Sequence, residues 1–448
     1  MAVAMLLVLP YLAHATFMPP HQEPLGFGKT GQEDAHILRR VKVVENSTVT
    51  VDDILGVAEN FNLDVWQVRS SSVDVHLTSG TEPSFHHFLE GSGLAYTDSA
   101  LPYSLVHPQS IRPQASAWNL SSLSNSTFHT DYRTIDEIGI FVKQLIDLHP
   151  DQARLVPIGH SSEHREMFAL EITANRTSLK KKTGFVITGA QHAREWIATS
   201  TALFIAHALL ADPSESYSMA SLLNTFDFYL VLLPNPDGYV YTWETDRFWY
   251  KNRQVVGAKA KCVGIDMNRF GYKWKSKAQF PAKNKNKTGT DPCAPWFPGN
   301  RAWEAPEVNN IANYITTLPN LGAHIDLRSY GQMISSPFSF SCKRTPKDAE
   351  DQLEAALGAS QALKAAHGTS FTTGSLCSLL YKAPGNIVDY MYARAGIKFS
   401  YAVHLRDTGT YGFVLPPEWI RPVGEETANM IKSLAGFIVG KKCAVTTN

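Results

Sequence analysis

The chain has 448 residues, which is enough for two or three domains and for a sizeable buried core. A hydrophobic share of 44% and a charged share of 18% are ordinary for a globular protein and exclude long disordered regions. Lys and Arg together number 41, as do Asp and Glu, so we expect neither a nucleic acid nor a membrane as partner. The classes that remain are enzymes and binding proteins.

The first residues, MAVAMLLVLPYLAHATF, are apolar, carry no charge and contain the small-x-small pattern Ala13-His14-Ala15. This pattern predicts a secretory signal peptide over residues 1–15. The alternatives are a disordered terminus or a short membrane anchor, but the stretch is too short to span a bilayer comfortably. No later apolar run reaches about 18 residues, so we expect a soluble protein that is secreted or sent to the vacuole through the secretory pathway.

Cysteines and glycosylation triplets agree with an oxidising compartment. In a secreted chain an odd number of cysteines leaves one without a partner, here among Cys262, Cys293, Cys342, Cys377 and Cys443. The N-x-Ser/Thr triplets, which accept glycans in the secretory route, begin at Asn46, Asn119, Asn125, Asn175 and Asn286. We therefore expect disulfide bonds and glycosylation.

Residues 37–110 predict a small α/β domain. RRVKVV and SVDVHLT alternate as strands do, and TVDDILGVAENFN has helical spacing behind a threonine N-cap. The following stretch is rich in Ser, Pro and Asn and predicts a linker over residues 111–130. Arg112 is the only Lys or Arg between Ser99 and Thr130, and Pro113 follows it, so a trypsin-like protease would cut this stretch poorly.

Residues 131–440 predict one larger α/β domain. Strand patterns occupy 184–190, 226–238, 322–332 and 397–409, and helical patterns occupy 195–212, 349–368, 386–396 and 424–440. Such alternation predicts a mixed, mostly parallel sheet covered by helices on both faces. Functional sites gather at the carboxyl ends of strands in sheets of this kind.

One such strand end carries the sequence GAQHAREW, in which His192 and Glu195 are three residues apart. An imidazole and a carboxylate at this turn can bind one metal ion together. Pairs of this spacing are common, and a surface pair is the alternative when the pattern stands alone.

The flanking motifs make the pattern specific. TGAQHAREW, NPDGY, CVGIDMNR, YKAPGNIVDY and HLRDTGTYGFVLP follow one another in this order. Together they resemble the zinc carboxypeptidase A/B family over about residues 132–438. Residues 37–110, with NFNLDVWQV, resemble the N-terminal prodomain of that family. The resemblance implies a carboxypeptidase-like fold, zinc as cofactor, and a monomer whose partners are the C-termini of peptides or proteins.

The resemblance also assigns roles to residues. His192 and Glu195 match the first two zinc ligands, and Asp266 matches the carboxylate that orients the ligand histidine. Asn268 and Arg269 match the pair that binds the terminal carboxylate of a substrate, for which a planar guanidinium is suited.

Further matches lie around the substrate. Arg194 matches an arginine on the substrate side, Tyr381 the mobile tyrosine that closes over the terminal residue, and Tyr330 a second tyrosine of the cleft. Val388 matches the floor of the specificity pocket, and its apolar side chain implies a preference for apolar or aromatic C-terminal residues. The implied disulfides are Cys262–Cys293 and Cys342–Cys377, which leaves Cys443 over.

The third zinc ligand of the family is a histidine in a motif of the form Ile-x-x-His-Ser-Tyr, and here that position holds Arg328. A guanidinium stays protonated and has no lone pair to give to a metal. The nearby His324 lies four strand residues away, about 13 Å, and cannot replace it. We therefore expect zinc binding to be weak or lost.

Two further positions differ from the family. His404 stands where the family has its catalytic glutamate, and Tyr250 stands where an arginine polarises the scissile carbonyl. Without a metal, no water has the lowered pKa that His404 would need to act as a base. A tyrosine brings no charge to the oxyanion, and losing one such donor costs on the order of 3 kcal/mol. The pattern is similar to fungal inactive carboxypeptidase-like proteins linked to cell-wall biogenesis.

Three hypotheses follow. The first is a secreted pseudoenzyme in which Arg328 pairs with Glu195 and the cleft still binds peptide C-termini. The second is an active zinc carboxypeptidase that releases apolar C-terminal residues, with His404 as substitute ligand beside His192 and Glu195. The third is a purely structural protein, such as a cell-wall or inhibitor protein, that does not use the cleft.

Overall fold

The computed structural model describes residues 35–44, 47–107, 118–175, 182–257, 262–269 and 291–446, with side chains described up to Lys441. The signal peptide predicted over residues 1–15, residues 111–117 of the predicted linker, the triplets at Asn46 and Asn286 and the side chain of Cys443 lie outside this range. The boundaries proposed for the domains therefore stay predictions.

The first described elements form a four-stranded antiparallel sheet. Its strand order is β2(Asp64–Arg69), β3(Ser72–Thr78), β1(His36–Lys42) and β4(Tyr96–Ala100). α1(Val51–Asn60) begins at a capping box between Thr50 and Asp53, and α2(Glu82–Ser92) ends at Gly93 in the left-handed region. Buried apolar side chains of both helices and of β1, β2 and β3 form one cluster, so this region has its own core.

The second sheet has eight strands. Their order is β11(Thr372–Ser375), β10(Met333–Ser336), β12(Phe399–His404), β9(Leu321–Arg328), β7(Thr183–Thr188), β8(Phe226–Val231), β6(Glu166–Ile172) and β5(Ala153–His160). The four central strands, from β12 to β8, run parallel, whereas β10 is antiparallel to β12 and β6 is antiparallel to β8 and β5. The predicted mixed sheet is confirmed.

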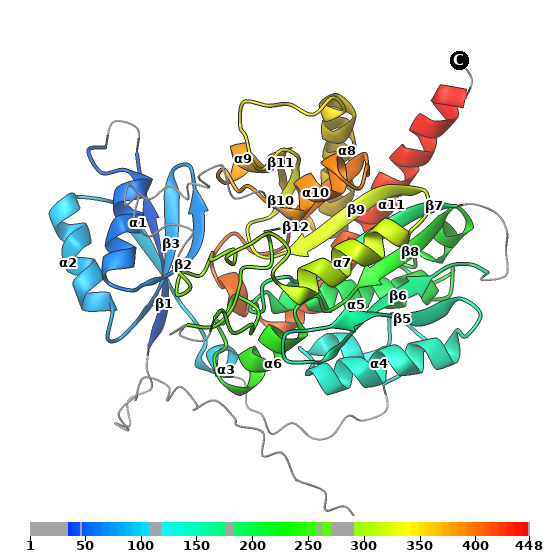
Figure 1. Cartoon of the computed structure of the whole chain (residues 1–448), viewed down its shortest axis with the longest axis horizontal. Helices are drawn as coiled ribbons and strands as arrows, with labels where there is room; N and C mark the ends of the chain where they lie inside the picture. Colours follow the sequence, from blue (N-terminus) through cyan, green and yellow to red (C-terminus); the bar gives the residue numbers. More distant parts are fainter. Residues whose placement is uncertain are drawn as a thin grey trace, which may run out of the picture. The chain divides into compact units, whose positions relative to one another are not determined.

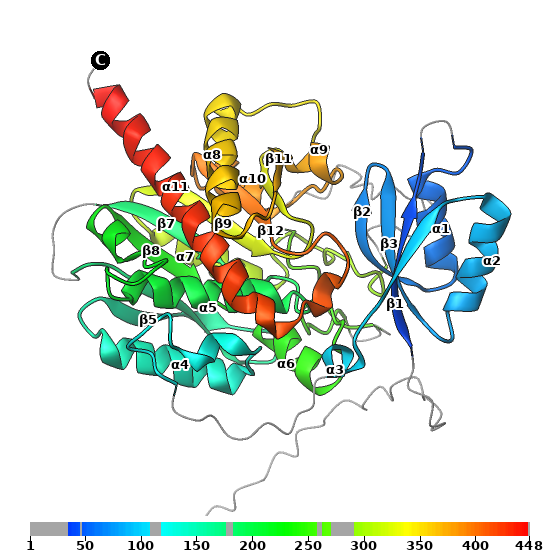
Figure 2. The same ribbon diagram turned by 180° about the vertical axis from the view of Figure 1, so that it is seen from behind.

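Helices cover both faces of this sheet. Buried side chains of α4(Ile135–Leu148), α5(Trp196–Leu210), α8(Ala349–His367) and α11(Ile420–Thr446) share one apolar cluster with the sheet, and Figure 2 shows α5, α8 and α11 on this side. The opposite face carries α7(Pro306–Thr317) and α10(Ile387–Ala393), which lie in front in Figure 1. Every residue of α5 is buried, as expected of a helix that is apolar on all sides.

Shorter elements complete the chain. They are α3(Tyr103–Val106), α6(Pro236–Glu244) and α9(Leu376–Leu379), with 3-10 helices at Thr127–Thr130, Ala220–Asn224, Gly412–Val414 and Pro417–Trp419. The described residues from Ala35 onward belong to one compact unit. None of their helices is both long enough and apolar enough to cross a membrane.

Candidate functional site

The carboxyl ends of β7, β9 and β12 meet at one edge of the sheet. Arg328 and His404 are the last residues of β9 and β12 and are paired in the parallel register, while β7 leads into the turn that carries His192. This turn lies so close to the next strand that a Cβ on Gly189 would come within 2.3 Å of the Leu232 carbonyl oxygen. The backbone therefore fixes the place of His192 tightly.

A cavity of about 100 Å³ opens at this edge. Its walls bring together most of the residues that the sequence assigned to the site: His192, Arg194, Glu195, Tyr250, Asn268, Arg269, Arg328, Tyr330, Tyr381 and His404. Asp266 lies behind this wall, fully buried, and Val388 is fully buried in α10, next to the wall residue Asn386.

The guanidinium of Arg328 lies between the two residues that matched zinc ligands. Its Nε donates to Glu195 Oε2 at 2.9 Å and its Nη2 donates to Glu195 Oε1 at 2.9 Å, a bidentate pair. Nη2 also contacts His192 Nδ1. All three side chains are at least 95% buried.

His192 bridges two carboxylates of the site. Its Nδ1 lies 2.9 Å from Glu195 Oε1 and also contacts Arg328 Nη2, and its Nε2 lies 2.9 Å from Asp266 Oδ1. The second carboxylate oxygen of Asp266 forms an ion pair with Arg269 Nη2 at 2.9 Å. Asp266 thus orients the histidine, as the resemblance implied, and also holds Arg269.

The two carboxylates remain ionised in spite of their burial. Burial by itself raises the pKa of Glu195, but the charge of Arg328 and the hydrogen bonds from His192 and Arg328 bring it below its usual range. The pKa of Asp266 is likewise raised by burial and lowered, with a net decrease, by Arg269 and His192. Each of these two buried carboxylates is therefore paired with an arginine, Glu195 with Arg328 and Asp266 with Arg269.

A third carboxylate, which the sequence reasoning missed, also faces the guanidinium. Asp326 Oδ2 lies 3.3 Å from Arg328 Nη1, and its Oδ1 accepts from Thr188 Oγ1 and Gln191 Nε2, both at 2.8 Å. Burial raises the pKa of Asp326, which Arg328 partly offsets. An acidic residue two positions before Arg328 on the same strand face was the available signal.

The remaining two substituted residues flank this cluster. The ring of Tyr250 stacks on His192 with centroids 3.6 Å apart, and burial raises its pKa well above the usual range. His404 is partly buried, and burial together with the Arg328 charge lowers its pKa to about 3. Neither residue restores the glutamate or the arginine of the family.

The donor set does not fit zinc. A tight site needs three ligands with free lone pairs, yet Arg328 engages His192 Nδ1 and both Glu195 oxygens, and is itself the third position. Within the described residues, no group of three His, Cys, Asp or Glu is placed to hold a metal ion, so His404 does not complete a set. His324 is buried on β9 beside Ser400 and Thr188, away from the cavity wall.

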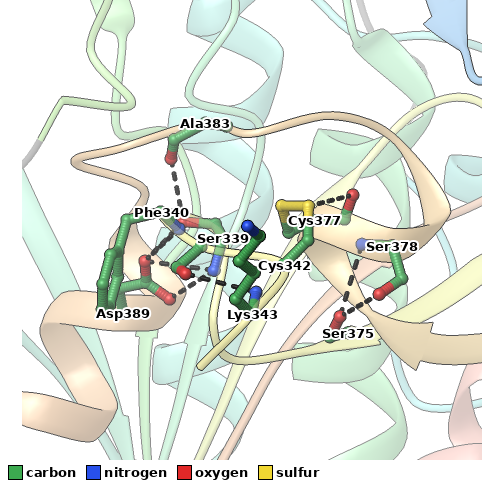
Figure 3. The surroundings of a disulfide bond; sticks show 10 residues. Ser339, Phe340, Cys342, Lys343, Ser375, Cys377, Ser378, Ala383 and Asp389 are labelled. Atoms are coloured by element: carbon green, nitrogen blue, oxygen red, sulfur yellow. Dashed lines mark hydrogen bonds between the residues drawn. A yellow bond between two sulfur atoms is a disulfide. The ribbon is translucent and has the colours of Figure 1, made fainter. Parts of the chain in front are cut away.

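The part of the site assigned to the terminal carboxylate is firmly held. Asn268 Oδ1 accepts from the backbone of Ile387 at 2.9 Å, which ties CVGIDMNR to the start of α10. Figure 3 shows Ser339 and Phe340 turned toward the Asp389 carboxylate, which accepts from both backbone N–H groups. Ser339 Oγ donates to the Ala383 carbonyl as well.

The same region carries one of two disulfides. Cys342–Cys377 joins the loop after β10 to α9, and Cys262–Cys293 joins two cysteines on either side of Asp266 in the sequence. These are the pairs that the resemblance implied. The loop that carries Tyr381 is therefore fastened on both sides.

The N-terminal region contributes part of the cavity wall. Residues 65–68 of β2 line it, and Arg194 Nη1 donates to both oxygens of Asp64 at 2.9 Å. Tyr330 donates its hydroxyl to Asp74 Oδ2 at 2.8 Å, and its carbonyl accepts from Gln67 Nε2. Two residues assigned to substrate binding are thus engaged by carboxylates of residues 37–110.

Comparisons with known proteins agree with this geometry. The profile of a family described as zinc carboxypeptidase matches residues 138–430. A protein of Ajellomyces dermatitidis named inactive metallocarboxypeptidase ECM14 is 32% identical over 428 residues, which cover 87% of this chain and 71% of that protein.

Solved structures are similar over most of the chain. The crystal structure of thrombin activatable fibrinolysis inhibitor matches with a TM-score of 0.77 and 27% identity, covering 91% of this chain and 100% of that one. The bovine thrombin-activatable fibrinolysis inhibitor, in complex with tick carboxypeptidase inhibitor, matches with a TM-score of 0.62 and 32% identity. That match covers 70% of this chain and 100% of the other.

Proposed function

The chain belongs to the zinc carboxypeptidase family, as its motifs predicted, and we propose that it is a secreted, catalytically inactive member that keeps a cleft for peptide C-termini. The observation that carries this proposal is the bidentate pairing of Arg328 with Glu195 at the position of the metal. The name of the similar fungal protein, which calls it inactive, supports the same conclusion.

The loss of metal has a simple electrostatic reason. A zinc ion would bring two positive charges beside a guanidinium that cannot lose its proton, in a site from which water is largely excluded. To bind, the ion would have to displace Arg328 from both Glu195 oxygens and leave this arginine buried without its partner. Zinc binding is accordingly weak or lost.

Hydrolysis lacks two more groups. His404, with a pKa near 3, is neutral at ordinary pH and has no metal-bound water to deprotonate. Tyr250 replaces a charged donor with a phenol whose ring is packed on His192. A substitution at one position alone could be compensated, but here the metal, the base and the electrophile are all changed.

The binding residues, by contrast, remain. Asn268, Arg269 and Tyr381, to which the resemblance assigns the binding of a terminal carboxylate, all line the cavity. Arg269 forms an ion pair with Asp266 through Nη2 and donates Nη1 to the Asn268 carbonyl. A guanidinium carries five N–H groups, so a ligand carboxylate can share it. A protein inhibitor occupies a similar protein in one solved complex, which supports peptide or protein C-termini as the ligand class.

The test is zinc analysis and a C-terminal peptidase assay on the same full-length protein. We expect far less than one zinc per chain and no release of phenylalanine from a peptide that ends in it. The variant Arg328→His/His404→Glu/Tyr250→Arg should bind zinc and release the residue. The matched control, His404→Glu/Tyr250→Arg, keeps Arg328 and should do neither. One zinc per chain in the natural protein would overturn the proposal.

A further inference from the structure

Residues 37–110 with His36, the first residue of β1, which we call the prodomain, contact the cleft domain at several places. One of these contacts combines an ion pair with an aromatic cluster. Asp64 accepts from Arg194 at 2.9 Å and from Trp66 Nε1 at 2.7 Å. Trp66 packs against Phe248 with ring centroids 4.9 Å apart, and Phe248 belongs to the domain that carries the cleft. A ligand that reaches Arg194 must first displace this contact.

Two histidines lie inside the same cluster. His36 Nδ1 of β1 and His76 Nε2 of β3 are 2.9 Å apart, and their rings are stacked at an interplanar angle of 6°. His76 also packs on Trp66 and on Phe248, with centroids 5.0 and 4.6 Å away, and is only 8% exposed. The pair therefore lies at the contact between the prodomain and the cleft domain.

The hydrogen bond between the two rings requires that at least one of them be neutral. A single proton lies between the two nitrogens, and a doubly protonated pair would place two N–H donors against each other. Both rings belong to the prodomain, and Phe248 covers His76 from the cleft domain. Undocking exposes the pair to water, where the repulsion between two charged rings is weaker, so docking is coupled to the protonation of the pair.

Among the described residues, nearby charges act on His76 in both directions, and burial outweighs them. Asp64 on β2 raises the pKa of His76, whereas His36 and Arg194 lower it. The His107 ring, just after α3, lies against His36 and Tyr103, and Asp246 of the cleft domain acts on Asp64 and Arg194. Asp64 is already paired with Arg194, whose positive charge opposes a charged His76. Burial raises the pKa of Asp246, so acid also weakens the negative charge on this side.

We infer that His36 and His76 form an acid-sensitive latch, which holds the prodomain over the cleft at neutral pH and releases it when both rings are protonated. The inference rests on the proposed binding function of the cleft. It also fits the linker sequence, in which the only Lys or Arg is followed by proline, so that opening does not depend on a trypsin-like cut there.

The size of the effect follows from linkage. Burial lowers the pKa of His76 to about 4 in the docked state, whereas an undocked histidine titrates near 6.5. The open state binds more protons between these values, so docking is full above pH 6.5 and is lost as the pH falls toward 4. Between pH 7.5 and pH 5, protonation of His76 alone shifts the equilibrium between the docked and the open prodomain about thirty-fold toward the open state.

The test uses the full-length protein at pH 7.5 and 5.0. Hydrogen–deuterium exchange of the β2 amides, corrected for the intrinsic rate, reports opening, and the anisotropy of a fluorescein-labelled peptide ending in phenylalanine reports access to the cleft. We expect both to increase at pH 5.0. His76→Gln should remove most of this increase, and His36→Gln serves as a second variant if His76→Gln does not fold.

Two controls make the outcome decisive. His86→Gln changes a histidine of α2 that is 38% exposed, and should keep the full pH response. Asp64→Asn should open the cleft at both pH values, because it breaks the ion pair with Arg194. The latch is overturned if wild-type exchange does not change with pH, or if His76→Gln and His36→Gln respond like His86→Gln. Opening at pH 5.0 without peptide binding at either pH supports the latch and overturns the binding function instead.

Discussion

A single guanidinium organises the centre of the cleft. Arg328 donates to Glu195 through two nitrogens, to Asp326 through a third, and contacts His192. Burying such a charge is costly, and the cost is offset because each of the three guanidinium nitrogens meets an acceptor. Arg328, whose presence disfavours a metal ion, therefore also supplies the positive charge beside His192 and Glu195.

Replacing Arg328 with Met should destabilise the fold strongly. Glu195 and Asp326 would remain buried without a positive partner, so we expect a loss of about 3–5 kcal/mol in the free energy of unfolding. Urea unfolding measures it. The matched control is Arg154→Met, whose arginine is 51% exposed in its pair with Glu171 and should cost at most about 1 kcal/mol. Equal losses in the two variants would contradict this account of the site.

Sequence reasoning at this scale found the substituted residues but not what holds them. Arg328, His404 and Tyr250 stand at motif positions, so their identity alone predicted that zinc binding is weak or lost. Gln191 lies within TGAQHAREW and Asp326 lies two residues before Arg328, but neither was assigned a role. Asp326 contacts both Gln191 and Arg328, and its contact with Gln191 depends on how β7 and β9 pair, which a single sequence does not contain.

The hydrophobic pattern of the sequence predicted most of the long helices and strands, but it did not predict the residues at which they end. The helix expected over 195–212 is α5, and the strand expected over 397–409 is β12, but β12 stops at His404. The strand expected over 226–238 ends at Val231, and α6 begins at Pro236, because proline favours the first helical position and Asn235 caps it. The four-residue strands β10 and β11 are too short to show a period.

The turn after β7 should not tolerate a larger residue at Gly189. An alanine Cβ would meet the Leu232 carbonyl oxygen at 2.3 Å, and the backbone cannot move without shifting His192. We expect Gly189→Ala to cost at least about 1–3 kcal/mol in thermal or urea unfolding. Gly139→Ala in α4, where a Cβ meets nothing within 4 Å, should instead stabilise by about 0.5–1 kcal/mol. A neutral Gly189→Ala would show that this turn is looser than its geometry indicates.

A buried histidine pair between α5 and the 3-10 helix at Thr127–Thr130 should make the fold sensitive to acid. His129 Nε2 and His207 Nδ1 are 3.0 Å apart, and His207 Nε2 donates to the Leu120 carbonyl. Burial lowers the pKa of His207 to about 4 and that of His129 well below its usual 6.5. The unfolded chain binds more protons in this window, so stability is full above pH 6.5 and decreases as the pH falls toward 4.

The expected loss from His207 alone is on the order of 3 kcal/mol. Unfolding free energies measured between pH 7 and 4.5 would show it as a slope. His207→Gln should flatten that slope, whereas His160→Gln, at an exposed histidine, should leave it unchanged. A steep slope that persists in His207→Gln would assign the acid sensitivity to other groups.

At the scale of the whole molecule, the prodomain and the cleft domain share one buried carboxylate. Asp74 accepts from Arg40 and Arg69 of the prodomain and from Tyr330 of the cleft domain, and Arg40 and Arg69 also donate to the Thr408 carbonyl. Charge-assisted bonds of this kind are stronger than neutral ones. The two parts are therefore expected to unfold together.

Removing the Tyr330 hydroxyl tests this coupling. In Tyr330→Phe, Asp74 loses one bond across the contact, which we expect to weaken docking by about 1.5–3 kcal/mol. Hydrogen exchange of β1 and β3 should then increase relative to that of β7 and β9. Tyr314→Phe, which removes a hydroxyl bonded to Glu171 within the cleft domain, should leave the prodomain unaffected. Equal exchange in both variants would mean that the contact depends on other groups.

The sequence by itself determined the family, the fold class and the loss of a metal ligand, because ordered motifs and hydrophobic periods are local properties of the chain. The tertiary structure decided that Arg328 occupies the place of the metal, that Asp326 supports it, and that Asp64 and Asp74 bind residues of the cleft. Arg328 and Glu195 are 133 positions apart, and Tyr330 and Asp74 are 256 apart. Such contacts depend on strand order and register, which are set by the packing of the whole chain.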